Sequence, residues 1–169
     1  MGKLTDLNKV NLDKGKFAAT LGDAHEHIVI GLLIRVGLEV GKVDVSSGPY
    51  DLFIYAYSAP KGNRIFLRAQ VKTIGATGSL HLGGGQRGGV DRVYKSGVKT
   101  YTYTTKHNDV IIGVDEDTLD LYIIPTMITE KRFKTSVSKN KLKIFKNNWD
   151  VLLNWNDGFL KKLDLKLVT

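Results

Sequence analysis

The chain has 169 residues, 42% of them hydrophobic, a size and composition that fit one globular domain with its own core, and we expect a single domain over residues 1–169. The absence of cysteine excludes a disulfide framework or thiolate metal site, and no run approaches the ~20 apolar residues of a membrane span, so we expect a soluble cytoplasmic protein. A net charge of +8 and a pI of about 9.6 favour a polyanionic partner.

A long helix is predicted from Gly15 to Val36, with Gly37 as its C-terminal cap. Its expected buried stripe recurs at three- and four-residue steps and consists of Phe17, Ala18, Leu21, Ala24, Ile28, Leu32 and Val36. Further apolar residues predict that its second half is buried on more than one side. Glu26 lies on this helix and is either a solvated position or a carboxylate that is paired or bound to metal.

A strand over residues 38–45 and then a hairpin are predicted next. The first arm of the hairpin is the apolar run Leu52 to Tyr57, and the second runs from Arg64 to Thr73 after a turn containing Pro60 and Gly62. Because side chains alternate along a strand, Arg68, Gln70 and Lys72 share one face. Gln70 and Lys72 therefore point together, toward the side where Asp51 is expected at the start of the first arm.

The pattern Pro49-Tyr50-Asp51 followed by Gln70-Val71-Lys72 resembles the PD-(D/E)XK nuclease superfamily, with one extra residue between Pro and Asp and with Gln70 in place of the usual acid. The resemblance is closer to the branch of group I intron homing endonucleases with this fold, which tolerates Gln-x-Lys and places a Glu on the preceding helix, here Glu26. It covers roughly residues 21–128. It implies a restriction-endonuclease-like fold in which Glu26, Asp51, Gln70 and Lys72 are the catalytic residues.

Phosphodiester cleavage explains why these residue types converge. A hard cation such as Mg²⁺, with Mn²⁺ as a substitute, takes oxygen ligands, and Asp51, the Gln70 side-chain oxygen and the Val71 carbonyl supply them, with Glu26 bound directly or through water. Lys72 orients or deprotonates the attacking water or stabilises the transition state. Replacing a carboxylate by the Gln70 amide removes one negative charge and weakens metal binding.

The segment after Lys72 is rich in glycine and then in basic and aromatic residues. We expect no packed element over residues 75–89, and interpret the glycines as a flap that approaches phosphates, against the alternative of a loop without function. Residues 94–106 are either a strand with packed tyrosines or a nucleic-acid surface. The predicted DNA-contacting residues of the whole chain are Arg68, Arg87, Arg92, Lys95 and Lys99.

A second apolar hairpin is predicted over residues 109–114 and 119–124, around an acidic turn, Asp115 to Thr118, that we interpret as solvated. We expect residues 129–169 to form a basic C-terminal extension for DNA binding or oligomerisation, following a core of about 15–128, although a run of charges is usually a solvated face. A short helix over residues 148–155 carries Trp149, Leu152, Leu153 and Trp155, which are candidates for an oligomer interface.

These elements predict an α/β fold: a central mixed β-sheet with a leading helix and a basic helical C-terminal region. The first functional hypothesis is a magnesium-dependent, site-specific endonuclease acting on double-stranded DNA as a homodimer or higher symmetric oligomer, since each strand needs a site. Its nearest variant is a Holliday-junction-resolvase or restriction-type nuclease. The rivals are a non-catalytic nucleic-acid-binding module on a nuclease fold, which Gln70 favours, and a protein that binds structured RNA.

Overall fold

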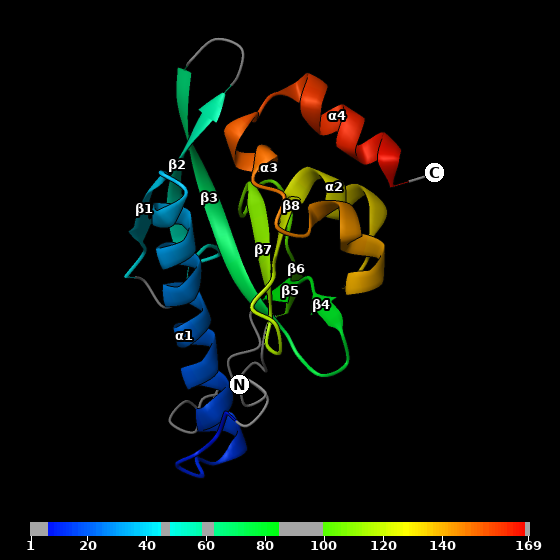
Figure 1. The fold of residues 1–169 in the computed structure, drawn as a ribbon. Helices are drawn as coiled ribbons and strands as arrows, with labels where there is room; N and C mark the ends of the chain where they lie inside the picture. The colour runs from blue at the N-terminus through cyan, green and yellow to red at the C-terminus, as the bar shows by residue number, and fades with distance from the viewer. Residues whose placement is uncertain (1–6, 45–47, 59–62, 85–99, 168–169) are drawn as a thin grey trace.

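A computed structural model describes residues 7–44, 48–58, 63–84 and 100–167 (Figure 1). In chain order its elements are α1 (Lys14–Arg35), β1 (Glu39–Lys42), β2 (Leu52–Ser58), β3 (Asn63–Ile74), β4 (Ser79–His81), β5 (Gly83–Gly84), β6 (Tyr101–Thr102), β7 (Val110–Asp115), β8 (Leu121–Pro125), α2 (Thr126–Arg132), β9 (Ser136–Ser138), the 3-10 helix η1 (Lys139–Phe145), α3 (Asp150–Leu153) and α4 (Asp157–Lys166).

The central sheet has the strand order β1-β2-β3-β7-β8. The strands β3 and β7 are parallel, and every other neighbouring pair in this sheet is antiparallel. Two small antiparallel ladders, β4-β9 and β5-β6, accompany it. The predicted α/β fold with a mixed sheet, a leading helix and C-terminal helices is therefore confirmed, and both predicted hairpins are present as β2-β3 and β7-β8.

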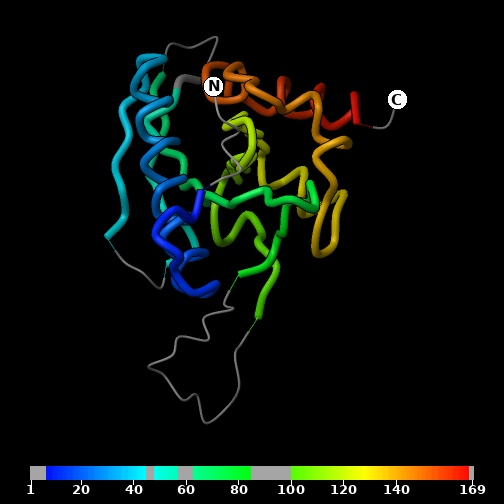
Figure 2. Tube along the Cα trace, turned by 60° about the horizontal axis from the view of Figure 1, so that its bottom comes forward, coloured from blue at the N-terminus to red at the C-terminus, as the bar shows by residue number. Residues whose placement is uncertain are grey.

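Helices pack against the sheet near both of its edge strands, β1 and β8. At one end α1 packs on β1 and β3, and at the other α2 and η1 pack on β8, while α3 bridges β2 and β8 (Figures 1 and 2). All residues of β7 and β8 are buried, as continuous apolar strands covered on both faces should be. The central strand β3 is buried only from Leu67 onward, so its second half joins the core to the region of the predicted site.

The helix α1 is capped at its start by the Asp13 carboxylate, which accepts the Lys16 N–H at 3.0 Å. It ends at Arg35, and Gly37 follows two residues later with a φ of 88°, which suits glycine. The cap is as predicted, but the predicted buried stripe is wrong. The buried residues are His25, Val29 and Leu33. Ile34 in the second half of the helix is exposed, so that half is not buried on more than one side as predicted. Because the second half of α1 is apolar on all sides, the periodicity of its apolar residues does not identify the face that packs.

By length and apolarity alone, α1 would qualify as a membrane span, which is weak evidence for a single helix. Core helices of soluble proteins meet the same criterion. In this fold α1 packs against β1 and β3 and carries Asp23 and Glu26, both paired with Lys42 of β1. These contacts make α1 a layer of the α/β fold.

The first part of the glycine-rich segment contains packed structure, which corrects the prediction for residues 75–84. Leu80 and Leu82 are buried, and β4 pairs with β9 from the C-terminal region. The acidic turn is also less solvated than predicted. Asp115 is buried, and its carboxylate accepts bonds from Lys139 Nζ at 2.6 Å and the Asp117 N–H at 3.1 Å.

The tryptophan segment packs on the core, and this corrects the alternative of an oligomer interface for Leu152 only. Leu152 is fully buried, and Trp149, Leu153 and Trp155 are partly buried against the same core. The helix α3 is shorter than predicted. It is followed by α4, where the Asn156 side chain accepts the Phe159 N–H at 3.0 Å as an N-cap.

Candidate active site

Asp51 is fixed at the point where β2 begins. Its backbone N–H donates to the Ala69 carbonyl at 2.8 Å, and its carboxylate Oδ2 accepts the backbone N–H of Val71 at 2.8 Å. The carboxylate thus takes over the ladder bond that a further residue of β2 would have made. Its position follows directly from the register of β2 on β3, in which Leu52 is opposite Ala69.

Gln70 is 5% exposed and lies beside Asp51. Its amide nitrogen Nε2 donates to Asp51 Oδ2 and, at 3.2 Å, to the Val71 carbonyl. Its oxygen Oε1 is buried and has no hydrogen-bond partner among the described residues. A buried amide oxygen without a partner carries a desolvation cost of about 1–3 kcal/mol, which a ligand at this oxygen would offset.

Glu26 reaches the same region from α1 and is shared with a lysine. Lys42 Nζ lies 3.2 Å from Glu26 Oε2 and 2.5 Å from Asp23 Oδ1. The hydrogen bond to Asp23 is the main cause of the raised pKa of Lys42, and the bond to Glu26 adds to it. The predicted Glu26 is therefore near the other candidates, with a lysine as its charge partner.

Lys72 follows Gln70 by two residues on β3 and lies against an aromatic ring. Its Nζ is 5.1 Å from the centroid of the Tyr103 ring, within the range of a cation–π interaction. Tyr103 is 4% exposed and packs edge-on against Tyr101 at 5.5 Å. Gly84 makes room for both rings, since a Cβ there would lie 2.8 Å from the Tyr103 hydroxyl. The sequence analysis predicted a basic and aromatic segment around Tyr103, but it did not predict the contact with Lys72.

One pocket of about 240 Å³ collects the four predicted catalytic residues. Its lining consists of Gly22, Glu26, Asp51, Gln70, Val71, Lys72 and Thr73. Within the described ranges no group of three or more His, Cys, Asp or Glu side chains could hold a metal ion. The oxygen donors at the pocket are instead mixed: the carboxylates of Asp51 and Glu26, the amide of Gln70 and the carbonyl of Val71. This set suits Mg²⁺, which needs only one or two protein carboxylates and keeps several waters.

A buried histidine links α1 to Thr73 of β3, which lines the pocket. His25 Nδ1 lies 2.8 Å from Thr73 Oγ1, and burial lowers the pKa of His25. His27 is exposed and lies 2.9 Å from the Asp23 carbonyl. The two histidines point to different sides of α1, as their spacing predicts, and His25 ties together the elements that carry Glu26 and Lys72.

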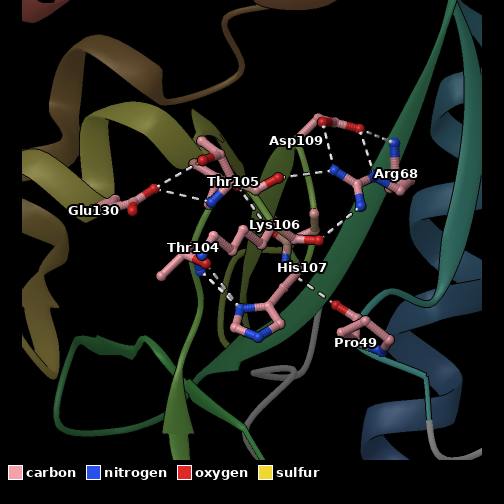
Figure 3. Close-up of polar contacts among 10 residues, drawn as sticks. Pro49, Arg68, Thr104, Thr105, Lys106, His107, Asp109 and Glu130 are labelled. Atoms are coloured by element: carbon pink, nitrogen blue, oxygen red, sulfur yellow. Dashed lines mark hydrogen bonds and ion pairs between the residues drawn. The ribbon is translucent and has the colours of Figure 1, made fainter.

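Arg68 of β3, which was predicted to contact DNA, is engaged in a polar network with the loop that precedes β7 (Figure 3). Its guanidinium bonds to both Asp109 carboxylate oxygens, at 3.1 and 3.0 Å, and to the carbonyls of Lys106 and Thr105, each at 2.9 Å. The hydrogen bond to Asp109 raises the pKa of Arg68. The guanidinium thus fixes the loop before β7, and this use was not foreseen from the sequence.

The same loop holds the segment that precedes Asp51. Asn108 is fully buried, and its Nδ2 donates to the Pro49 carbonyl at 3.1 Å, while its Oδ1 accepts the Thr126 hydroxyl at 2.6 Å. Thr105 is bound in turn by Glu130 of α2, at 2.9 and 3.1 Å (Figure 3). Asn108 gave no signal in the sequence beyond its place before an apolar strand. The other predicted DNA-contacting residues, Arg87, Arg92, Lys95 and Lys99, lie outside the described residues.

A nuclease of known structure shares this arrangement of strands and helices. It is the bacterial homing endonuclease I-Ssp6803I, with a TM-score of 0.59 and 16% sequence identity, over 90% of this chain and 97% of that chain. At this identity the likeness establishes a common fold. No protein-family model matches the sequence, and no curated protein matches it either.

Proposed function

We propose that this chain is a metal-dependent DNA endonuclease of the PD-(D/E)XK type, related in function to homing endonucleases. The observation that carries the proposal is the convergence of Glu26, Asp51, Gln70 and Lys72, from one helix and two strands, on a single pocket. The nuclease fold shared with a bacterial homing endonuclease supports it. The net charge of +8 fits binding to double-stranded DNA.

Asp51, Gln70 and the Val71 carbonyl would hold Mg²⁺, with Glu26 as an additional carboxylate. When bound, the metal supplies Lewis-acid stabilisation of the phosphate and a more acidic water. Rotation of the Gln70 amide by 180° exchanges its oxygen and nitrogen, so the amide can present an oxygen next to Asp51. Lys72 brings a positive charge to the same pocket, where it stabilises charge on the phosphate as a water oxygen bonds to phosphorus and an ester oxygen leaves.

The test is cleavage of supercoiled and linear DNA with Mg²⁺ or EDTA, by wild type, Asp51→Ala and Lys72→Ala. We expect metal-dependent nicks or discrete fragments from wild type and a loss of about 10²–10³-fold in each variant. Lys106→Ala, a basic residue outside the pocket, serves as the matched control. A panel of linear, four-way-junction and single-stranded DNA separates a homing or restriction-type enzyme from a resolvase.

A non-catalytic DNA-binding module on the same fold is the second candidate. The Gln70 amide already satisfies Asp51 within the protein, which is the observation that favours it. This candidate predicts mobility shifts with DNA, no cleavage with Mg²⁺ or Mn²⁺ over the panel, and no cleavage by Gln70→Glu. That combination of results would remove catalysis from the proposal.

A further inference from the structure

The outward face of β1, β2 and β3 carries aromatic side chains in the open. Their register places Glu39, Tyr55 and Phe66 in one cross-strand row and Gly41, Phe53 and Arg68 in the next. Phe66 is 70% exposed, and its ring stacks on Tyr55 at 4.5 Å. Large exposed aromatic groups of this kind mark interaction sites rather than ordinary surface.

A hollow of about 490 Å³ lies in this face, and we name it the β1–β3 aromatic surface. It is lined by Glu39, Val40, Gly41, Phe53, Tyr55 and Phe66. Gly41 creates the hollow, because it is opposite Phe53 and a Cβ at Gly41 would meet nothing within 4 Å. The surface therefore offers both projecting rings and a space that can receive a ring.

The charges around this surface disfavour nucleic acid as its occupant. Arg64 donates to Glu39 at 2.5 Å and lies over the Tyr55 ring at 5.1 Å, while Arg68 is bound to Asp109. A phosphate backbone arriving here would meet the exposed Glu39 carboxylate and two guanidiniums already engaged by carboxylates. A partner surface with exposed apolar side chains, one carboxylate and one guanidinium matches this surface better than nucleic acid does.

The chain itself carries such a partner surface, and we propose that the β1–β3 aromatic surface binds a second copy of this chain about a two-fold axis. In an isologous contact the Phe66 of each copy can enter the hollow over Gly41 of the other, and Glu39 of each can face Arg64 of the other. In a chain with a net charge of +8, self-association meets least repulsion where acid and base are balanced.

The contact would couple the two candidate sites. Phe53 is two residues after Asp51 on β2, so a two-fold contact through this surface holds two pockets at a fixed separation. Under the proposed function, on which only this step rests, one pocket would serve each DNA strand. Assembly itself is independent of the chemistry, so its test can fail or succeed without the nuclease.

Sedimentation velocity over a series of protein concentrations tests the contact without DNA or metal. We expect wild type to be a dimer or a higher assembly of dimers, and Phe66→Glu to dissociate with an unchanged circular-dichroism spectrum. Leu165→Glu on α4 is the matched control, because Leu165 is 66% exposed but lies elsewhere, and it should assemble like wild type. A monomeric wild type, or assembly unchanged in Phe66→Glu, overturns the proposal.

A charge exchange tests the two-fold pairing. Glu39→Arg and Arg64→Glu each place like charges across the contact, so each variant alone should associate more weakly than wild type. An equimolar mixture restores opposite charges in both pairs and should form heterodimers. Failure of the mixture to associate better than either variant alone overturns the two-fold arrangement.

Discussion

At the scale of single residues, Gln70 is the position where the proposed cation site can be tested. Changing Gln70→Glu places a second carboxylate beside Asp51, where like charges repel unless a cation is bound. We expect the thermal midpoint of Gln70→Glu to fall below that of wild type in EDTA and to rise more steeply with Mg²⁺, because binding to the folded state stabilises it. Scanning fluorimetry with a Mg²⁺ titration measures both effects.

Gln70→Leu is the control for that experiment, since it removes the amide without adding charge. Its thermal midpoint should depend on Mg²⁺ less than that of wild type, because only one proposed ligand is lost. If Gln70→Glu also gains nothing from Mg²⁺, then Asp51 and residue 70 do not share a cation, and the ligand set proposed above is wrong.

A second test at a single residue concerns Tyr103, whose ring lies under the ammonium group of Lys72. Tyr103→Leu removes a cation–π interaction of about 1 kcal/mol. We expect the single-turnover cleavage rate to fall about fivefold. Tyr103→Phe keeps the ring face under Lys72 Nζ and should cleave like wild type. Equal losses in both variants would assign the effect to the hydroxyl and the surrounding packing.

At the scale of elements, the loop before β7 connects the segment that precedes Asp51 to the helix α2. Asn108 joins the Pro49 carbonyl to α2 through the Thr126 hydroxyl. Asn108→Ala leaves both groups without this partner, and we expect the free energy of unfolding to drop by about 1–3 kcal/mol. Urea denaturation measures the change. Asn140→Ala, at an exposed position, should differ from wild type by less than about 0.5 kcal/mol.

A second link between elements gives a pH dependence. Asp164 of α4 accepts bonds from Arg132 Nε and Lys131 Nζ, each at 2.5 Å, and the bond from Arg132 is the main reason that its pKa is lowered to about 2. Because the folded pKa lies below the ordinary value of 3.8, ionised Asp164 stabilises the fold above about pH 4, and this is lost as the pH falls toward 2.

Asp164→Asn should therefore cost at most about 2 kcal/mol at neutral pH and progressively less as the pH falls from 4 to 2. Urea midpoints of wild type and variant, measured over this range, should converge at the acid end. Asp117→Asn, at an exposed position of the acidic turn, should run parallel to wild type throughout. A constant gap between Asp164→Asn and wild type would mean that the ionised carboxylate is not the stabilising form.

The elements that were predicted well are those whose own residues determine them. The strands β2, β3, β7 and β8 are short apolar runs with clear turns, and their register brings Asp51 next to Gln70 and Val71. The face of α1 was mispredicted because tertiary neighbours determine it: the buried His25 has its partner, Thr73, on the distant strand β3. The ladder of β4 with β9 joins residues almost sixty positions apart, which local patterns do not reveal.

At the scale of the whole molecule, the distribution of charge also depends on tertiary partners that local sequence patterns do not reveal. The sequence shows a basic C-terminal region, but not which lysines are used internally. Lys139 pairs with the buried Asp115 at 2.6 Å, and Lys146 pairs with Asp120 at 2.8 Å. Lys141 and Lys143 are exposed, and the part of the chain that the structure describes provides no ion pair for them. Between Lys139 and Lys146, Lys141 and Lys143 are the described lysines whose charge remains for a polyanion.

We therefore expect the double variant Lys141→Ala, Lys143→Ala to bind DNA more weakly and with less salt dependence. Each phosphate contact contributes about 0.9 to the slope of log affinity against log salt, so the slope should decrease by about 2. Fluorescence anisotropy with a labelled duplex over a salt series measures this. Lys139→Ala is the matched control: it should lower stability through Asp115 and leave the slope unchanged. An unaltered slope in the double variant would mean that DNA binds elsewhere and that this basic region serves only solubility.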